Sequence, residues 1–173
     1  QGQDEFYFAL PYAQMDLALW ALNHQRPAGE LAAAIGVDTA TAEAVNLAYA
    51  QYRGKRKKIV MSPSVNPQYR EVIRTYTQAM GLEEAGDEAA NSELSPEALI
   101  SLIDESTMLV VVQYPDFFGR IHDYTKLIED AHAKGALVCA VANPTALLML
   151  KTPAEMGADI VVGEAQPFGI PLW

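Results

Sequence analysis

The apolar positions follow two different patterns along the chain, and the change lies near residue 58. Up to about residue 53 they recur at helical spacing, and Gly36 and Gly54 stand where helices commonly end. After residue 58, short apolar runs alternate with amphipathic stretches. The pattern predicts helices over 15–22, 31–35, 39–52, 67–80, 124–133 and 145–150, a further helix that starts at residues 95–98, and strands over 59–61, 108–112, 137–142 and 160–162.

The order of the predicted elements after residue 58 indicates an α/β fold. Strands that alternate with helices through short links pair in parallel, with right-handed crossovers. The runs 108–112 and 137–142 hold no charged residue, which is typical of strands buried on both faces. We therefore predict a helical segment over 1–37, followed by an α/β domain with a parallel sheet over 38–173.

Ligands of open parallel sheets bind outside the carboxyl ends of the strands. This rule places a candidate site before any particular side chain is considered. The expected strand ends are 62–67, 113–119, 143–144 and 163–166. Among their residues, Asp116 and Glu164 are a carboxylate pair that could converge.

The outer strands are the weakest part of the predicted sheet. Residues 83–93 are acidic and small, which favours a surface loop or a poor edge strand. Residues 160–162 are expected to form the other edge, with unpaired backbone groups that promote association. Residues 1–37 supply further apolar surface, so we predict a homo-oligomer, most simply a two-fold dimer, in which this segment packs on a neighbouring α/β domain. The apolar residues concerned are Phe6, Phe8, Leu10, Met15, Leu19, Trp20, Phe168, Ile170, Leu172 and Trp173.

Composition and charge exclude several classes of protein. The 173 residues carry 22 acidic and 12 basic side chains, a net charge of −10, which disfavours binding to nucleic acid. The residue pattern over 28–45 is similar to that of a helix-turn-helix motif. A helix that reads DNA needs basic side chains, and the first one after this stretch is Arg53. No apolar run approaches the roughly 20 residues of a membrane span, so we expect a cytoplasmic protein without membrane contact.

Few side chains have the spacing of a known catalytic or metal site. Cys139 is the only cysteine, so neither a disulfide within the chain nor a cysteine-built metal site is expected. The histidines have no metal-ligand spacing, and no phosphate-binding glycine loop occurs. We therefore predict no metal and no catalytic residue in this chain. The histidines are His24, His122 and His132.

Four long strings in the second part of the chain resemble a known family. They are similar to glycine dehydrogenase (decarboxylating) subunit 1, one half of the split P-protein of the glycine cleavage system. The resemblance covers about residues 38–173 and implies the large domain of the aminotransferase-like fold, which pyridoxal phosphate (PLP) enzymes use. The strings are KKIVMSPSVNPQYREVIRTY, VVVQYPDFFGRIHD, AHAKGALVCAVANP and GADIVVGEAQPFGIPL.

The resemblance also implies where the cofactor positions would lie. Asn66 stands where the family commonly has a ring-stacking histidine, and Asn143 stands where PLP enzymes place the acid that pairs with the pyridine nitrogen. An amide cannot carry that negative charge. Both asparagines precede a proline, where they are also favoured simply as turn residues. No lysine lies in a recognisable Schiff-base motif, so the resemblance implies a non-catalytic subunit or fragment without its own cofactor, whose partner subunit carries PLP.

A second resemblance covers residues 3–37. The string DEFYFALPYAQMDLALWALNH is similar to the C-terminal helical region of bacterial NAD synthetase. The alternative prediction is therefore a recombined or engineered structural protein without activity, joined near residues 36–39.

Overall fold

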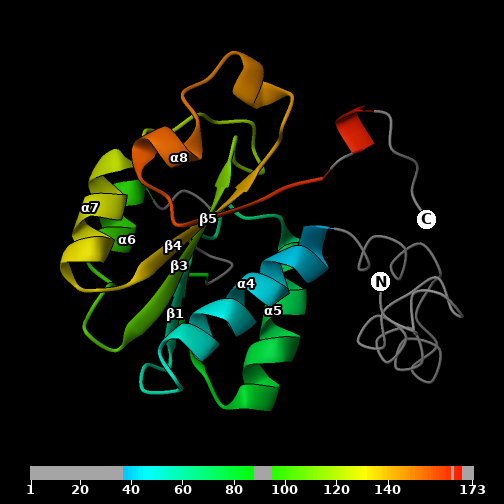
Figure 1. Cartoon of the computed structure of the whole chain (residues 1–173). Coiled ribbons are helices and arrows are strands. Elements are labelled where there is room, and N and C mark those ends of the chain that lie inside the picture. Colours follow the sequence, from blue (N-terminus) through cyan, green and yellow to red (C-terminus); the bar gives the residue numbers. More distant parts are fainter. Residues whose placement is uncertain (1–36, 88–94, 165, 169–173) are drawn as a thin grey trace, which may run out of the picture. The chain divides into compact units, whose positions relative to one another are not determined.

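The structure is a computed structural model that describes residues 37–87, 95–164 and 166–168 (Figure 1). The predicted helices over 15–22 and 31–35, and the resemblance to NAD synthetase, lie outside these residues. The described elements are α4 (Val37–Gln51), β1 (Lys58–Met61), α5 (Pro67–Met80), β2 (Glu83–Ala85), α6 (Pro96–Ile100), β3 (Thr107–Tyr114), α7 (Thr125–Ala133), β4 (Leu137–Ala142), the 3-10 turn η2 (Ala146–Leu148), α8 (Pro153–Met156), β5 (Ile160–Val162) and the 3-10 turn η3 (Gln166–Phe168).

The strands form one five-stranded sheet in the order β2-β1-β3-β4-β5, and every pairing is parallel. The chain moves outward from β1 to β2 and then returns to the other side of β1 with β3. In open parallel sheets, ligands usually bind outside the carboxyl ends of the strands, near such a reversal of strand order. The predicted α/β class and parallel sheet are confirmed.

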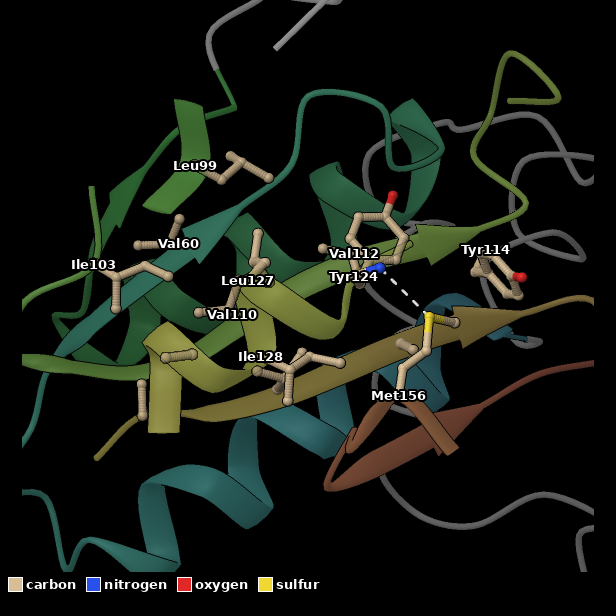
Figure 2. Packing of buried hydrophobic residues seen from close by; sticks show 14 residues of the cluster. Val60, Leu99, Ile103, Val110, Val112, Tyr114, Tyr124, Leu127, Ile128 and Met156 are labelled. Carbon is tan, nitrogen blue, oxygen red and sulfur yellow. Dashed lines mark hydrogen bonds between the residues drawn. The ribbon is translucent and has the colours of Figure 1, made fainter. Parts of the chain in front are cut away.

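Alternate residues of the central strands pack into two separate cores. Ile59, Leu109 and Cys139 face α4 and α5 in one core, together with Val45 and Ile73. The neighbouring strand residues face the opposite layer, as Figure 2 shows for Val60, Val110 and Val112 beside Leu127 of α7. Helices therefore cover both faces of the sheet, with α4 and α5 on one side and α6 and α7 on the other (Figure 1).

Local sequence signals explain where the helices begin and end. The Asn66 side chain accepts the backbone N–H of Gln68 at 2.9 Å, Pro67 follows it, and α5 stops at Gly81 in the left-handed conformation. Thr152 and Glu155 form a capping box around α8. The pattern missed α8 because a helix of four residues is too short to show periodicity.

One strand and one helix differ in extent from the prediction. The β3 strand runs to Tyr114 rather than ending at residue 112, because its pairing with β4 continues to Tyr114 opposite Ala142. The predicted helix over 145–150 is only the 3-10 turn η2, with Leu148 and Met149 exposed, so no buried face extends it. The edge strands agree with the prediction, since β2 lies within 83–93 and β5 is the opposite edge of the described sheet.

Candidate functional site

A small cleft lies at the carboxyl ends of β3 and β4, beside the residues that follow β5. Its volume is about 130 Å³. Three of the four predicted strand ends contribute to it, and α5 adds Tyr69, which the pattern did not single out. The lining residues are Tyr69, Gln113, Pro115, Val141, Ala142, Asn143, Pro144, Glu164 and Pro167. The cleft therefore lies at the end of the sheet where ligands of open parallel sheets bind.

Asn66 lies beside the cleft but does not line it. Its side-chain oxygen is engaged in the cap of α5, and its backbone N–H donates to Oε1 of Gln113 at 2.8 Å. Asn66 thus performs the turn role expected of an asparagine before proline. Asn66 also orients Gln113, which lines the cleft. The sequence pattern placed Gln113 at a strand end but gave it no function.

Asn143 lines the cleft, but its side chain is committed to a local turn. Its Oδ1 accepts the backbone N–H of Thr145 at 3.0 Å and the Thr145 hydroxyl at 2.6 Å. Its backbone N–H donates to the carbonyl oxygen of Tyr114 at 3.1 Å, which holds the turn against the end of β3. The side-chain oxygen of Asn143 therefore serves a local turn, as the side-chain oxygen of Asn66 does.

The carboxylate pair considered from the sequence does not converge in the cleft. Glu164 lines the cleft, and its Oε1 accepts the hydroxyl of Tyr69 at 3.3 Å. Asp116 is only 4% exposed and is not a lining residue. Its Oδ1 accepts the backbone N–H groups of Phe118 and Arg120, at 2.9 and 2.8 Å, so it organises the loop after β3.

The side chains around Asp116 form one polar cluster next to the core. Nε of Arg120 lies 2.7 Å from Oδ2 of Asp116, and Nε2 of His122 lies 3.6 Å from the same oxygen. Behind them, burial raises the pKa of Tyr124 well above its usual value, and the negative charge of Asp116 adds to the shift. The backbone N–H of Tyr124 also contacts Sδ of Met156 at 3.4 Å (Figure 2).

The other candidate side chains lie away from the cleft or have structural partners. Ser62 and Ser64 are buried and hydrogen-bonded to each other at 2.7 Å. His132 pairs with Asp159 at 2.8 Å near the opposite ends of the strands. Within the described ranges, no group of acidic, histidine and cysteine side chains could hold a metal ion.

None of the chain's lysines lines the cleft. Lys58 pairs with Asp104 at the start of β1, and Lys126 pairs with Asp130 on α7. Lys151 donates to the hydroxyl of Thr125 at 3.0 Å. The remaining lysines, Lys55, Lys57 and Lys134, are exposed in turns before β1 and β4.

None of the described helices is long and apolar enough to cross a membrane.

Known proteins resemble more than three quarters of this chain. A probable glycine dehydrogenase (decarboxylating) subunit 1 from Desulforamulus reducens is 47% identical over 135 residues, which are 78% of this chain and 30% of the relative. A crystal structure of glycine decarboxylase (P-protein) of the glycine cleavage system, in inhibitor-bound form, superposes with a TM-score of 0.68 at 37% identity, over 79% of this chain and 30% of that chain.

A NifS-like protein shares the fold alone, with a TM-score of 0.63 at 16% identity over 79% of this chain and 38% of that chain. These neighbours confirm the aminotransferase-like fold. The chain spans about 30% of the length of the curated relative from D. reducens. The sequence profile of the family described as glycine cleavage system P-protein matches residues 30–173. The chain therefore belongs to the glycine cleavage system P-protein family.

Proposed function

We propose that this chain is part of a non-catalytic P-protein subunit, which needs a PLP-carrying partner subunit for glycine decarboxylation. The relative from D. reducens is named as subunit 1 of glycine dehydrogenase (decarboxylating), and the inhibitor-bound P-protein structure shares the fold of the α/β domain. The observation that carries the proposal is the hydrogen bonding of the Asn143 side chain. Its side-chain oxygen is used by Thr145, and an amide cannot supply the negative charge that keeps a pyridine nitrogen protonated.

Two further features of the cleft disagree with a resident PLP. No lysine of the chain lines it, so an amine that could attach the cofactor is missing there. Its volume of about 130 Å³ is also well below the roughly 300 Å³ at which pockets for cofactor-sized ligands begin. The residues present do not fit the group, which supports a non-catalytic role for this chain. We propose that the assembly works in the cytoplasm.

The direct test is borohydride reduction of the 173-residue chain in the presence of PLP, followed by peptide mapping of pyridoxyl-lysine. We expect weak labelling spread over the exposed lysines. The Asn143→Asp variant, which restores a carboxylate, should behave in the same way because it adds no lysine. Stoichiometric labelling of one lysine in the unmodified chain would overturn the proposal.

The partner requirement has its own test. Co-expression of the tagged chain with a PLP-carrying P-protein subunit should give a complex that co-purifies, and the chain alone should release no carbon dioxide from carboxyl-labelled glycine. Release of labelled carbon dioxide by the chain alone would contradict the non-catalytic role. Failure to co-purify at micromolar concentrations would contradict the partner requirement.

We also propose self-association through β5, the edge strand of the described sheet. Val161 on β5 is 44% exposed, and an apolar depression of about 250 Å³ adjoins it. An edge strand with apolar neighbours promotes pairing with another chain. Sedimentation of the chain should show a dimer, and Val161→Lys should shift it toward a monomer. A monomer at millimolar concentration would reject this proposal.

The alternative of a recombined chain rests on the resemblance of residues 3–37 to NAD synthetase and on the predicted boundary at residues 37 and 38. The family profile begins at residue 30, inside the predicted helical segment. Sequencing of the source DNA across the codons for residues 25–45 tests the alternative directly. A continuous genomic reading frame would exclude a join introduced during cloning.

A further inference from the structure

The loop after β3 carries three large apolar side chains at the protein surface. Phe117, Phe118 and Ile121 are 48%, 54% and 58% exposed. The rings of Phe117 and Phe118 contact each other edge to face, with 5.5 Å between their centroids. We call these three residues the apolar knob. Exposed apolar side chains that gather in one short segment commonly mark an interaction surface.

The backbone of the apolar knob is held in place by contacts within the chain. The backbone N–H of Phe117 donates to the carbonyl oxygen of Ser64 at 2.9 Å, which ties the loop to the segment after β1. The carboxylate of Asp116 accepts the N–H groups of Phe118 and Arg120 at 2.9 and 2.8 Å. Binding through a preorganised surface costs less conformational entropy than binding through a flexible one. The apolar knob is therefore suited to insertion into a pocket of a partner.

Arg120 extends the apolar knob with a charge that is already neutralised. Its Nε lies 2.7 Å from Oδ2 of Asp116, and its guanidinium lies over the ring of Phe118, with Cζ 5.0 Å from the centroid. Aromatic side chains and arginine contribute most to the binding energy of protein interfaces. Small molecules instead bind in concave pockets, and neither of the two cavities described above is lined by a residue of the knob. The composition therefore favours a protein as the partner.

The charges beside the apolar knob are mainly negative. Asp123 follows Ile121 by two residues and is exposed, and the exposed Glu97 is close enough to His122 for their charges to interact. Lys151 lies 3.9 Å from Asp123 and offsets part of this charge. The whole chain carries a net charge of −10. A partner surface with basic side chains around an apolar pocket would complement this arrangement.

We propose that the apolar knob is the docking site of the partner subunit, which receives Phe117 and Phe118 in a pocket that is apolar at its centre and basic at its rim. The inference rests on the proposed function, which requires a partner but assigns it no place on this chain. The two rings exclude water from the pocket, and Glu97 and Asp123 face the basic rim. A second copy that docked knob to knob would bring the same acidic groups together, which disfavours that arrangement.

The test measures binding of the 173-residue chain to an immobilised PLP-carrying P-protein subunit by surface plasmon resonance. Phe117→Ser/Phe118→Ser should raise the Kd at least about thirtyfold, because two central anchors of the interface are lost. Ile121→Ser alone should raise it about fivefold. The matched control is Leu148→Ser/Met149→Ser, which removes two exposed apolar side chains at η2. This control should leave the Kd within about twofold of the unmodified chain.

A second pair of variants tests the basic rim. Glu97→Gln/Asp123→Asn should lower the association rate constant about threefold to tenfold at about 50 mM salt, and less at about 500 mM, where charges are screened. Both replacements keep an oxygen that accepts the local hydrogen bonds. The matched control Glu83→Gln/Glu105→Gln removes two exposed carboxylates at the opposite ends of the strands and should change the rate constant by less than about twofold. An equal decrease in the two variants would contradict the basic rim.

The outcomes separate the docking site from the partner requirement. If the unmodified chain binds and the folded Phe117→Ser/Phe118→Ser variant loses no more affinity than the control at η2, the docking site is wrong and the partner requirement stands. If the unmodified chain does not bind, both are wrong. The urea midpoint shows whether each variant is folded, and Ile121→Ser replaces the double variant if that one is not.

Sedimentation of the chain without the partner tests the other occupant. Phe117→Ser/Phe118→Ser should leave the mass of the unmodified chain unchanged, because the rings contact the partner subunit and not a second copy. Conversion of a dimer to a monomer by this variant would identify a second copy as the occupant and overturn the proposal.

Discussion

Asp116 and Arg120 join the two ends of the loop after β3. The carboxylate of Asp116 contacts the backbone N–H and the side chain of Arg120, and the backbone N–H of Asp116 donates to the carbonyl oxygen of Arg120 at 3.0 Å. Oδ1 of Asp116 accepts the Arg120 backbone N–H at 2.8 Å, and Oδ2 lies 2.7 Å from Nε of the guanidinium. The loop between them presents Phe117 and Phe118, which are 48% and 54% exposed. A buried carboxylate thus fixes two aromatic rings at the surface.

Removal of this carboxylate should be strongly destabilising. Asp116→Ala leaves the N–H groups of Phe118 and Arg120 without their acceptor next to the core, and we expect the free energy of unfolding in urea to fall by about 2–4 kcal/mol. The control Glu105→Ala removes an exposed carboxylate and should change it by less than about 0.5 kcal/mol. Equal effects of the two substitutions would contradict the role of Asp116.

Two leucines test the position of the core. Leu127 is fully buried between α7 and the sheet, whereas Leu148 is 79% exposed on η2. Leu127→Ala should lower the free energy of unfolding by about 2–5 kcal/mol, since it removes apolar contacts and leaves a cavity. Leu148→Ala should change it by less than about 0.5 kcal/mol. Chemical denaturation with a two-state fit measures both values.

Two glycines separate backbone conformation from steric overlap. Gly81 and Gly86 both have positive φ angles, of 64° and 93°. An added Cβ would meet nothing within 4 Å at Gly81, but at Gly86 it would lie 2.8 Å from the carbonyl oxygen of Met61. Gly81→Ala should therefore cost only the conformational strain, about 1 kcal/mol. Gly86→Ala should cost at least about 1 kcal/mol more, as measured by the urea midpoint.

The thiol of Cys139 should make the stability fall at alkaline pH. Burial raises the pKa of this thiol to about 12, whereas an unfolded cysteine ionises near pH 8.5. The raised pKa leaves the stability unchanged below about pH 8.5 and lowers it as the pH rises toward 12, because only the unfolded chain loses the proton. Between pH 9 and 11 the slope should reach about 1.4 kcal/mol per pH unit.

The Cys139→Ala variant supplies the comparison. Its free energy of unfolding is expected to fall less steeply between pH 9 and 11, even if the smaller side chain lowers the value at pH 7. The difference between the two slopes is the contribution of the thiol. Identical slopes would show that Cys139 ionises equally in both states.

The central strands could be predicted from the sequence because both of their faces are covered. In a strand buried on two sides every position is apolar, so the runs in β3 and β4 stand out without any knowledge of their neighbours. The start of α5 was equally clear, since Asn66 and Pro67 form a cap from adjacent residues. Such features depend on local chemistry alone.

The chemistry of the cleft was only partly predictable. The rule for parallel sheets placed Asn143 and Glu164 at one edge, but it gave no reason to choose Tyr69, which comes from a helix. It also left Asp116 as a candidate partner of Glu164. The structure places the Asp116 carboxylate inside its own loop, because nearby backbone N–H groups satisfy it.

The sequence by itself determined the order and kind of the main elements, the alternation that requires a parallel sheet, and the motifs of the family. These follow from the spacing of apolar residues and from short-range capping, which neighbouring residues decide. Only the tertiary structure decided that β3 continues to Tyr114, that the backbone N–H of Asn143 donates to Tyr114, and that Glu164 accepts the hydroxyl of Tyr69. Each of these depends on atoms brought together from distant segments, and local patterns carry no information about such contacts.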